Sequence, residues 1–130
     1  MERVYNFLQE AETYYLATVD GDQPRVRPFG TVDLFEDKIY IQTGKKKDVS
    51  KQIQENNRVE ICCFDGQDWL RLSGKLVRDD RVEAKKHMLD NYPQLRGMYD
   101  ENDDNTEVLY FTEAMAVMSS FSKAPEEVEW

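Results

Sequence analysis

Residues 24–53 read PRVRPFGTVDLFEDKIYIQTGKKKDVSKQI, and this stretch decides how the chain folds. Branched and aromatic residues predict one strand over residues 24–35 and a second over 38–43, with Glu36–Asp37 as the turn between them. Apolar residues at helical spacing after the lysine run then predict a short amphipathic helix. Strand, turn, strand and helix therefore follow one another without a long loop.

Three consecutive lysines, Lys45, Lys46 and Lys47, lie where this helix begins. A helix N-terminus carries partial positive charge, so acidic residues are preferred there and lysines are unfavourable. Because the whole chain has a formal net charge of -9, this local excess of positive charge predicts a bound anion. N–H groups at a helix start, together with ammonium groups, form a phosphate site. The alternative interpretation is a solvated basic turn whose lysines point into water.

Arg25 and Arg27 lie on the first strand of the same stretch. Strand alternation predicts that the two arginines share one face and that Val26 and Pro28 share the other. A planar guanidinium suits phosphate oxygens, which points to the same anion. Pro24 and Pro28 remove ladder donors and indicate an edge or irregular section. Charge and proline on an edge strand are also typical of protection against aggregation.

The rest of the chain predicts further short elements. Helical spacing predicts an opening helix over residues 4–11, and Asp79–Asp80 is a candidate N-cap for a helix to about Leu89, with Pro93 preventing its continuation. The remaining predicted strands cover residues 14–19, 58–64, 69–77, 108–111 and 114–121. Six or so strands with short turns predict a mainly β protein, an antiparallel β-barrel in which two or three peripheral helices cover openings or edges.

The length and composition predict one domain over residues 1–130. With 40% hydrophobic and 33% charged residues, the chain is typical of a soluble globular protein. Its negative charge disfavours nonspecific binding to nucleic acid. No apolar run reaches membrane-spanning length and the start lacks a signal-peptide core, so we expect no membrane partner and a cytoplasmic location.

Few residues suggest chemistry of their own. Cys62 and Cys63 are adjacent, so their side chains point to opposite faces of a strand, and we expect two buried thiols in a reducing compartment. His87 is the only histidine and lies among lysines on a predicted helix, so we expect a surface residue. Without a second histidine or metal-ligand spacing, we expect no metal site and no Ser-His-Asp arrangement.

Several of these segments resemble, in this order, the pyridoxamine 5'-phosphate oxidase-like family. Residues 15–21, 24–28, 39–43 and 57–61, with Lys-Asp-Val-x-Lys-Gln at 47–52, carry the resemblance over nearly the whole chain. The chain is most similar to the short branch that includes nitroimidazole-resistance flavoproteins. The resemblance implies an FMN-binding split β-barrel and a homodimer that holds two FMN molecules at its interface.

The resemblance also implies which residues contact FMN. The strand with the arginines would line the flavin ring and ribityl chain. The end of the next strand would also contact the cofactor, and the lysines would hold the phosphate. In chain order these residues are Arg25, Val26, Arg27, Pro28, Phe29, Gln42, Thr43, Lys46 and Lys47. The chain lacks the C-terminal Arg-x-His type signature of the larger oxidases, which argues against oxidation of pyridoxamine phosphate. His87 is badly placed for the flavin-side histidine of some relatives, which argues against drug reduction.

The residues and the resemblance together predict an FMN-binding flavoprotein, an oxidoreductase acting on an unidentified small molecule with a nicotinamide electron donor as a candidate reductant. A flavin carries the redox chemistry itself, which suits a chain without an evident base or nucleophile. Two alternatives are a non-catalytic carrier or sensor of flavin or haem, and a barrel that acts only as a dimeric scaffold.

Overall fold

The computed structural model describes residues 1–130, and its strands form one antiparallel sheet. The strands are β1 (Tyr14–Asp20), β2 (Gln23–Phe29), β3 (Asp33–Phe35), β4 (Lys38–Gly44), β5 (Arg58–Phe64), β6 (Asp68–Asp79), β7 (Thr106–Ser120) and β8 (Glu126–Glu129). The helices are α1 (Glu2–Ala11), α2 (Asp48–Glu55), α3 (Val82–Asn91) and the short 3₁₀ helix η1 (Pro93–Gly97). The expected mainly β split barrel with peripheral helices is confirmed.

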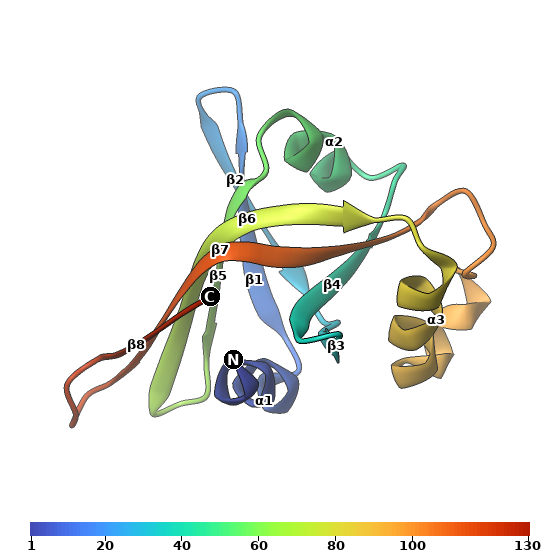
Figure 1. Cartoon of the computed structure of the whole chain (residues 1–130). Helices are drawn as coiled ribbons and strands as arrows, with labels where there is room; N and C mark the ends of the chain where they lie inside the picture. The colour runs from blue at the N-terminus through green and yellow to red at the C-terminus, as the bar shows by residue number, and fades with distance from the viewer.

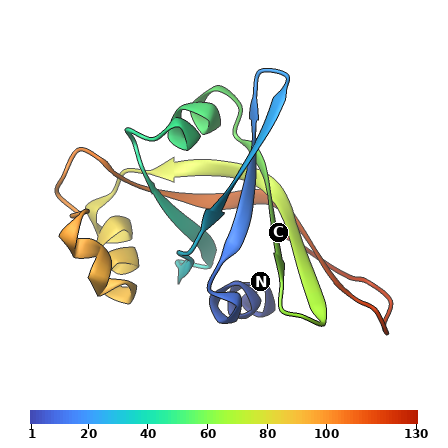
Figure 2. The same ribbon diagram turned by 180° about the vertical axis from the view of Figure 1, so that it is seen from behind.

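Across the sheet the strands run β2-β1-β5-β6-β7-β4-β3, and β8 pairs with β7 outside this path. Figure 1 shows the sheet curling so that α1 and α2 lie at opposite ends of the barrel and α3 stands to one side. Seen from behind in Figure 2, the β1–β2 hairpin projects beside α2. None of the helices is long and apolar enough to cross a lipid bilayer.

Alternating apolar side chains build the core of the barrel. On β5, Val59, Ile61 and Cys63 are buried, because every second side chain of a strand points to the same face. Val4 and Leu8 of α1 are buried in the same cluster. Burying such side chains stabilises the fold by roughly 1.5–3 kcal/mol each.

The antiparallel pair of β6 and β7 is irregular where its register shifts between Ser73 and Lys75. A Cβ atom on Gly74 would lie 3.0 Å from the carbonyl oxygen of Thr112 and 3.1 Å from the Cα atom of Ala114. Across from this point, Glu113 has a left-handed backbone with φ 48. The close approach of the two strands therefore requires glycine at position 74.

The predicted first strand of the 24–53 stretch is shorter than expected, because β2 ends at Phe29 and residues 30–32 belong to no strand. Two tyrosine hydroxyls form hydrogen bonds with the backbone of this segment. The hydroxyl of Tyr14 donates to the carbonyl of Thr31 at 2.6 Å, and the hydroxyl of Tyr92 bonds both the N–H and the carbonyl of Val32. The chain is thus free to turn into β3 on the other edge of the sheet.

Two further boundaries differ from the sequence prediction. The segments 108–111 and 114–121 form one strand, β7, followed by the unpredicted β8. The residue before α3 is Arg81, and neither Asp79 nor Asp80 caps the helix with its side chain. Asp79 still ends β6, and its carboxylate accepts a hydrogen bond from the backbone N–H of Arg81 at 3.1 Å.

Candidate functional site

A cavity of about 290 Å³ lies between the end of β2, the end of β4 and η1. Its lining residues are Pro28, Phe29, Gly30, Thr31, Gln42, Thr43, Lys47, Leu95, Met98 and Tyr99. It brings together five of the residues that the resemblance implicates, namely Pro28, Phe29, Gln42, Thr43 and Lys47. We call it the first cavity.

The wall contributed by β4 carries unsatisfied polar atoms. Gln42 and Thr43 are 6% and 4% exposed, and Gln42 Oε1 and Thr43 Oγ1 have no hydrogen-bond partner. A buried polar atom without a partner costs on the order of 1–3 kcal/mol, so native proteins rarely keep one without a reason. Because consecutive strand residues point to opposite faces, one of these two atoms can face the cavity, where a polar ligand would satisfy it.

The lysine run lies at the start of α2, as predicted, with Lys47 as the residue before the helix. Asn105 fixes its backbone, because the N–H of Lys45 donates to the Asn105 carbonyl at 2.7 Å and the N–H of Lys46 donates to Asn105 Oδ1 at 3.0 Å. The ammonium group of Lys45 pairs with Asp80 at 3.5 Å, whereas Lys46 and Lys47 form no ion pair. Two free cations therefore lie beside a helix N-terminus, an arrangement that favours an anion.

Four of the predicted residues, Arg25, Val26, Arg27 and Lys46, do not line the first cavity. Arg27 donates to the Leu16 carbonyl and Thr18 Oγ1 with one nitrogen and to Gln52 Oε1 with another, at 2.7–3.1 Å. Burial, with a smaller effect of the neighbouring Arg25, lowers the pKa of Arg27.

Arg27 thus ties the β1–β2 hairpin to α2 through Gln52. Arg25 is exposed and pairs with Asp20 at 3.1 Å. The repulsion between the two arginines is relieved by these protein acceptors, which sequence alternation alone did not reveal.

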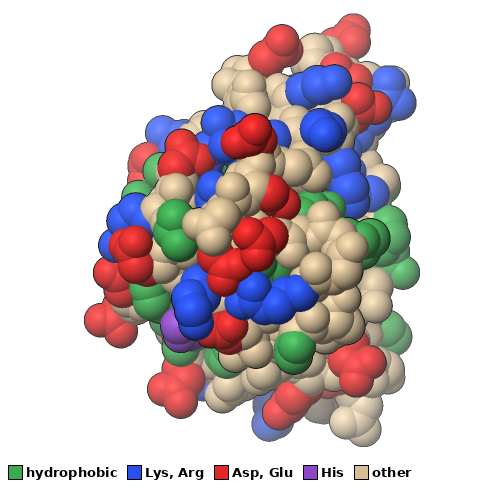
Figure 3. Space-filling model, turned by 90° about the vertical axis from the view of Figure 1, so that its right-hand side faces the viewer, with side chains coloured by type: hydrophobic (Ala, Val, Ile, Leu, Met, Phe, Trp, Pro, Cys, Tyr) green, Lys and Arg blue, Asp and Glu red, His purple; other side chains and the backbone are tan.

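His87 lies at the surface, and the two cysteines differ in exposure. The His87 side chain is 43% exposed, as expected of a surface residue, but its Nδ1 lies 2.6 Å from a carboxylate oxygen of the buried Asp33. In Figure 3 the only histidine, in purple, lies among charged side chains of both signs. The prediction of two buried thiols is wrong for Cys62, which is exposed because its strand face points outward. Cys63 is buried, and burial raises the pKa of its thiol to about 12.

Sequence reasoning missed the wall opposite β4. Leu95 lies in η1, and Met98 and Tyr99 follow it directly. These residues are far from Thr43 in the sequence, and no motif marks them. Only the packing of η1 against the barrel places them at the cavity.

Comparison with known proteins relates this chain to one family model and to several solved structures. The model described as Pyridoxamine 5'-phosphate oxidase matches residues 1–112. A NimC/NimA family protein from Clostridium acetobutylicum is 41% identical and has a TM-score of 0.96, with 100% of this chain and 92% of that chain covered. No protein with a curated function matches significantly.

More distant structures share the fold. A pyridoxamine 5'-phosphate oxidase-related, FMN binding protein from Nostoc punctiforme has a TM-score of 0.65 at 15% identity, covering 98% of this chain and 91% of that chain. A heme binding protein from Mycobacterium smegmatis has a TM-score of 0.71 at 12% identity, covering 94% of this chain and 57% of that chain.

Proposed function

Because this chain belongs to the pyridoxamine 5'-phosphate oxidase family, we propose that it is an FMN-binding flavoprotein that transfers electrons to a small molecule. The observation that carries the proposal is the first cavity itself. It is lined by Gln42 and Thr43 of β4, each of which keeps a buried polar atom without a partner, and by Lys47 at the start of α2.

The residues present suit FMN part by part. Lys46, Lys47 and the first N–H groups of α2 would hold the phosphate, since cations and helix starts both bind anions. Pro28 and Phe29 would border the flavin ring, and the segment Gln42–Thr43 of β4 would contact the cofactor from the other wall. Arg27 would act from outside the cavity, by holding α2 against the β1–β2 hairpin.

Bound FMN would supply the electron transfer, so the protein needs only to bind, orient and shield it. No cluster of His, Cys, Asp or Glu side chains could hold a metal ion. A nicotinamide nucleotide is the candidate reductant, and the acceptor is a small molecule of unassigned class.

We also propose that the protein is a homodimer. Tyr15, Val26 and Phe64 are 52%, 67% and 57% exposed. Tyr15 pairs with Cys62 across β1 and β5, and Phe64 pairs with Trp69 across β5 and β6, so these side chains share the outward face of the sheet. We call Tyr15, Val26, Cys62, Phe64 and Trp69 the outer apolar face. Exposed apolar surface of this kind marks interfaces.

A flavin titration tests the function. Purified protein freed of ligand is titrated with FMN and with riboflavin, and the flavin absorbance and fluorescence are recorded. FMN is expected to bind much more tightly than riboflavin, because only FMN carries the phosphate. Bleaching of bound FMN by NADH or NADPH, with oxygen consumed on re-oxidation, would support an enzyme. Failure to bind FMN would refute the proposal.

The same titration addresses a non-catalytic carrier. A fold relative is a heme binding protein, so haem is titrated in parallel and its Soret band is followed. Stoichiometric haem binding without FMN binding would favour a haem carrier. Tight FMN binding without reduction by either nicotinamide nucleotide would favour a flavin carrier or sensor.

A further inference from the structure

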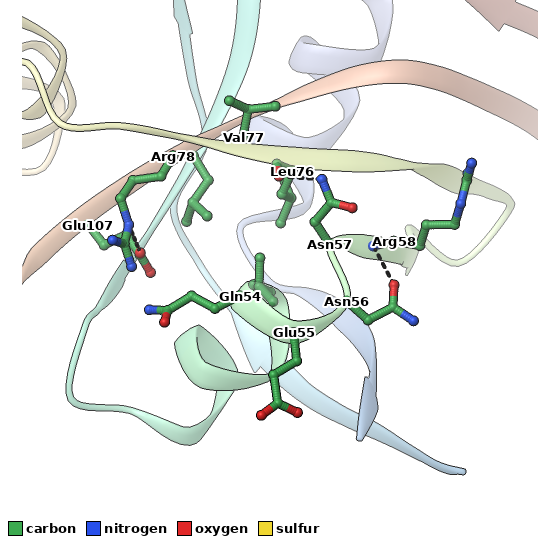
Figure 4. Close-up of a pocket in the computed structure, with 11 residues that line it drawn as sticks. Gln54, Glu55, Asn56, Asn57, Arg58, Leu76, Val77, Arg78 and Glu107 are labelled. Carbon is green, nitrogen blue, oxygen red and sulfur yellow. Dashed lines mark hydrogen bonds and ion pairs between the residues drawn. The ribbon is translucent and has the colours of Figure 1, made fainter. Parts of the chain in front are cut away.

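A larger cavity, of about 660 Å³, lies at the C-terminal half of α2, whereas the first cavity lies at its N-terminal end. It is open to solvent and is lined by the C-terminal half of α2, the start of β5, the end of β6 and the start of β7, and Figure 4 shows the side chains around it. Its apolar lining residues are Ile53, Leu76, Val77 and Leu109, and Figure 4 shows Asn56 and Asn57 along one side. We call it the second cavity. None of its lining residues lines the first cavity.

An ion pair between a half-buried arginine and a buried glutamate forms the polar wall of the second cavity. Glu107 on β7, whose side chain is 1% exposed, pairs with Nε of Arg78 on β6. Each residue keeps one buried polar atom without a hydrogen-bond partner, Oε1 of Glu107 and Nη2 of Arg78. Leaving such atoms unsatisfied is costly, and buried ionic groups are normally fully bonded. The wall therefore offers one free acceptor and one free donor on two bonded side chains.

The charge of the lining limits which ligand fits. Arg58 and Arg78 balance Glu55 and Glu107, so the ionic groups around the cavity sum to zero. A charged ligand would gain little net attraction from this balance. The apolar lining residues suit a flat ring, and the cavity volume is typical of small-molecule sites.

We propose that the second cavity binds a neutral planar ring carrying an amide edge, with its N–H donating to Glu107 Oε1 and its C=O accepting from Arg78 Nη2. Carboxamides of aromatic rings and the lactam edges of nucleobases share this chemistry. Binding would satisfy both free atoms of the ion pair and leave the pair intact. This site is separate from the proposed FMN site, so either can exist without the other.

Nicotinamide and uracil are the probes, one for each source of an amide edge. Each is titrated into isotope-labelled protein, with and without FMN, and backbone N–H signals are followed by NMR. A fragment of this size is expected to bind with a dissociation constant of about 1 mM. Signals of residues 54–58, 76–78 and 107 should shift. Binding of nicotinamide alone would identify an aromatic carboxamide as the ligand class, and binding of uracil alone would identify a nucleobase. Either result supports the proposal.

Nicotinic acid, which has a carboxylate in place of the amide, is the ligand control. It is expected to bind at least tenfold more weakly, since its carboxylate meets Glu107 and cannot donate. Equal binding of nicotinic acid and nicotinamide would overturn the proposal, as would no shift with either amide probe. Shifts confined to residues 28–31 and 95–99 would also overturn it, because those residues surround the first cavity.

Two tryptophan variants on α2 provide a matched pair. Gln54 is exposed, and Figure 4 shows it extending toward Arg78 and Glu107. Gln54→Trp should fill the second cavity and weaken amide binding at least tenfold, with FMN affinity unchanged. Lys51→Trp places the same side chain at an exposed position of the helix outside the cavity, and should leave amide binding unchanged. Equal amide binding by both variants and the parent would contradict the location.

Discussion

Lys46 and Lys47 differ from Lys45 in having no carboxylate partner. We expect the double substitution of Lys46 and Lys47 by Ala to weaken FMN binding about tenfold or more, because charge-assisted phosphate contacts are lost. Riboflavin affinity should barely change, since riboflavin lacks the phosphate. Flavin fluorescence titrations of the parent and the variant with both ligands measure the effect. Lys85 is buried on α3 and therefore unsuitable as a control, so the double substitution of the exposed Lys86 and Lys123 by Ala serves as the charge-matched control. Unchanged FMN affinity would reduce the lysine run to a solvated basic turn.

Arg27 acts through geometry that lysine cannot reproduce, because its guanidinium reaches Leu16, Thr18 and Gln52 at once. Arg27→Lys keeps the charge but should lower the free energy of unfolding by about 1–2 kcal/mol. FMN should also bind more weakly, since α2 loses its tie to the β1–β2 hairpin.

Arg25→Lys is the matched control for Arg27→Lys, because Arg25 is exposed and pairs only with Asp20. Urea unfolding and FMN titration of both variants give the comparison. Equal stability of the two variants would show that the contacts of Arg27 contribute nothing beyond charge.

At the scale of elements, the close approach of β6 and β7 depends on Gly74. Gly74→Ala would place a methyl group about 3.0 Å from the Thr112 carbonyl oxygen, where backbone atoms must shift. We expect a loss of about 1–3 kcal/mol in the free energy of unfolding, as for other overpacked sites. Gly97 is the control, because a Cβ atom there meets nothing within 4 Å. Thermal unfolding should separate Gly74→Ala from Gly97→Ala, and coincident melting temperatures would contradict the close approach.

Asp79 joins the end of β6 to neighbouring elements. Its carboxylate accepts hydrogen bonds from Arg81 and from the hydroxyl of Tyr40, and chiefly the Arg81 contact lowers the pKa of Asp79 to about 2. A lowered folded-state pKa means that this stabilisation, roughly 2 kcal/mol, is present above pH 4 and is lost as the pH falls toward 2.

Asp79→Asn isolates that contribution from the other carboxylates. The difference in unfolding free energy between parent and variant should shrink as the pH falls from 5 toward 2. The comparison is made only at pH values at which the parent is folded. Urea unfolding at several pH values measures it. A constant difference over this range would show that ionised Asp79 adds no stability.

Particular elements show how far the sequence could predict the fold. Strand β5 was predicted with its observed bounds, Arg58–Phe64, because strict alternation of buried and exposed residues is a local signal. The break at residues 30–32 was not, since it depends on hydroxyls of Tyr14 and Tyr92 that approach only in the folded chain.

The first cavity divides in the same way. Gln42, Thr43 and Lys47 lie close together in the sequence, at the end of β4 and in the turn into α2. One sequence segment was therefore enough to predict all three. Met98 and Tyr99 reach the cavity only through the packing of η1, and sequence spacing holds no sign of it. The second cavity likewise depends on Arg78 and Glu107 meeting across two strands.

At the scale of the whole molecule, the outer apolar face predicts self-association. We expect a two-chain mass by sedimentation at micromolar concentration with FMN bound. The double substitution of Tyr15 and Phe64 by Glu should shift the protein toward the one-chain mass, because buried charges oppose the interface. Val82→Glu on α3, another exposed apolar position, should leave the mass unchanged. A one-chain mass for the parent would refute the dimer.

Thr43 and Glu107 stand opposite each other across β4 and β7. Thr43 lines the first cavity and Glu107 the second, so the two cavities meet at a single cross-strand pair. Thermodynamic reciprocity then sets a rule for their ligands: whatever factor FMN applies to the affinity of the amide, the amide applies to the affinity of FMN. If this coupling factor is above one, a neutral metabolite in the second cavity would make the protein retain FMN more firmly without contacting FMN.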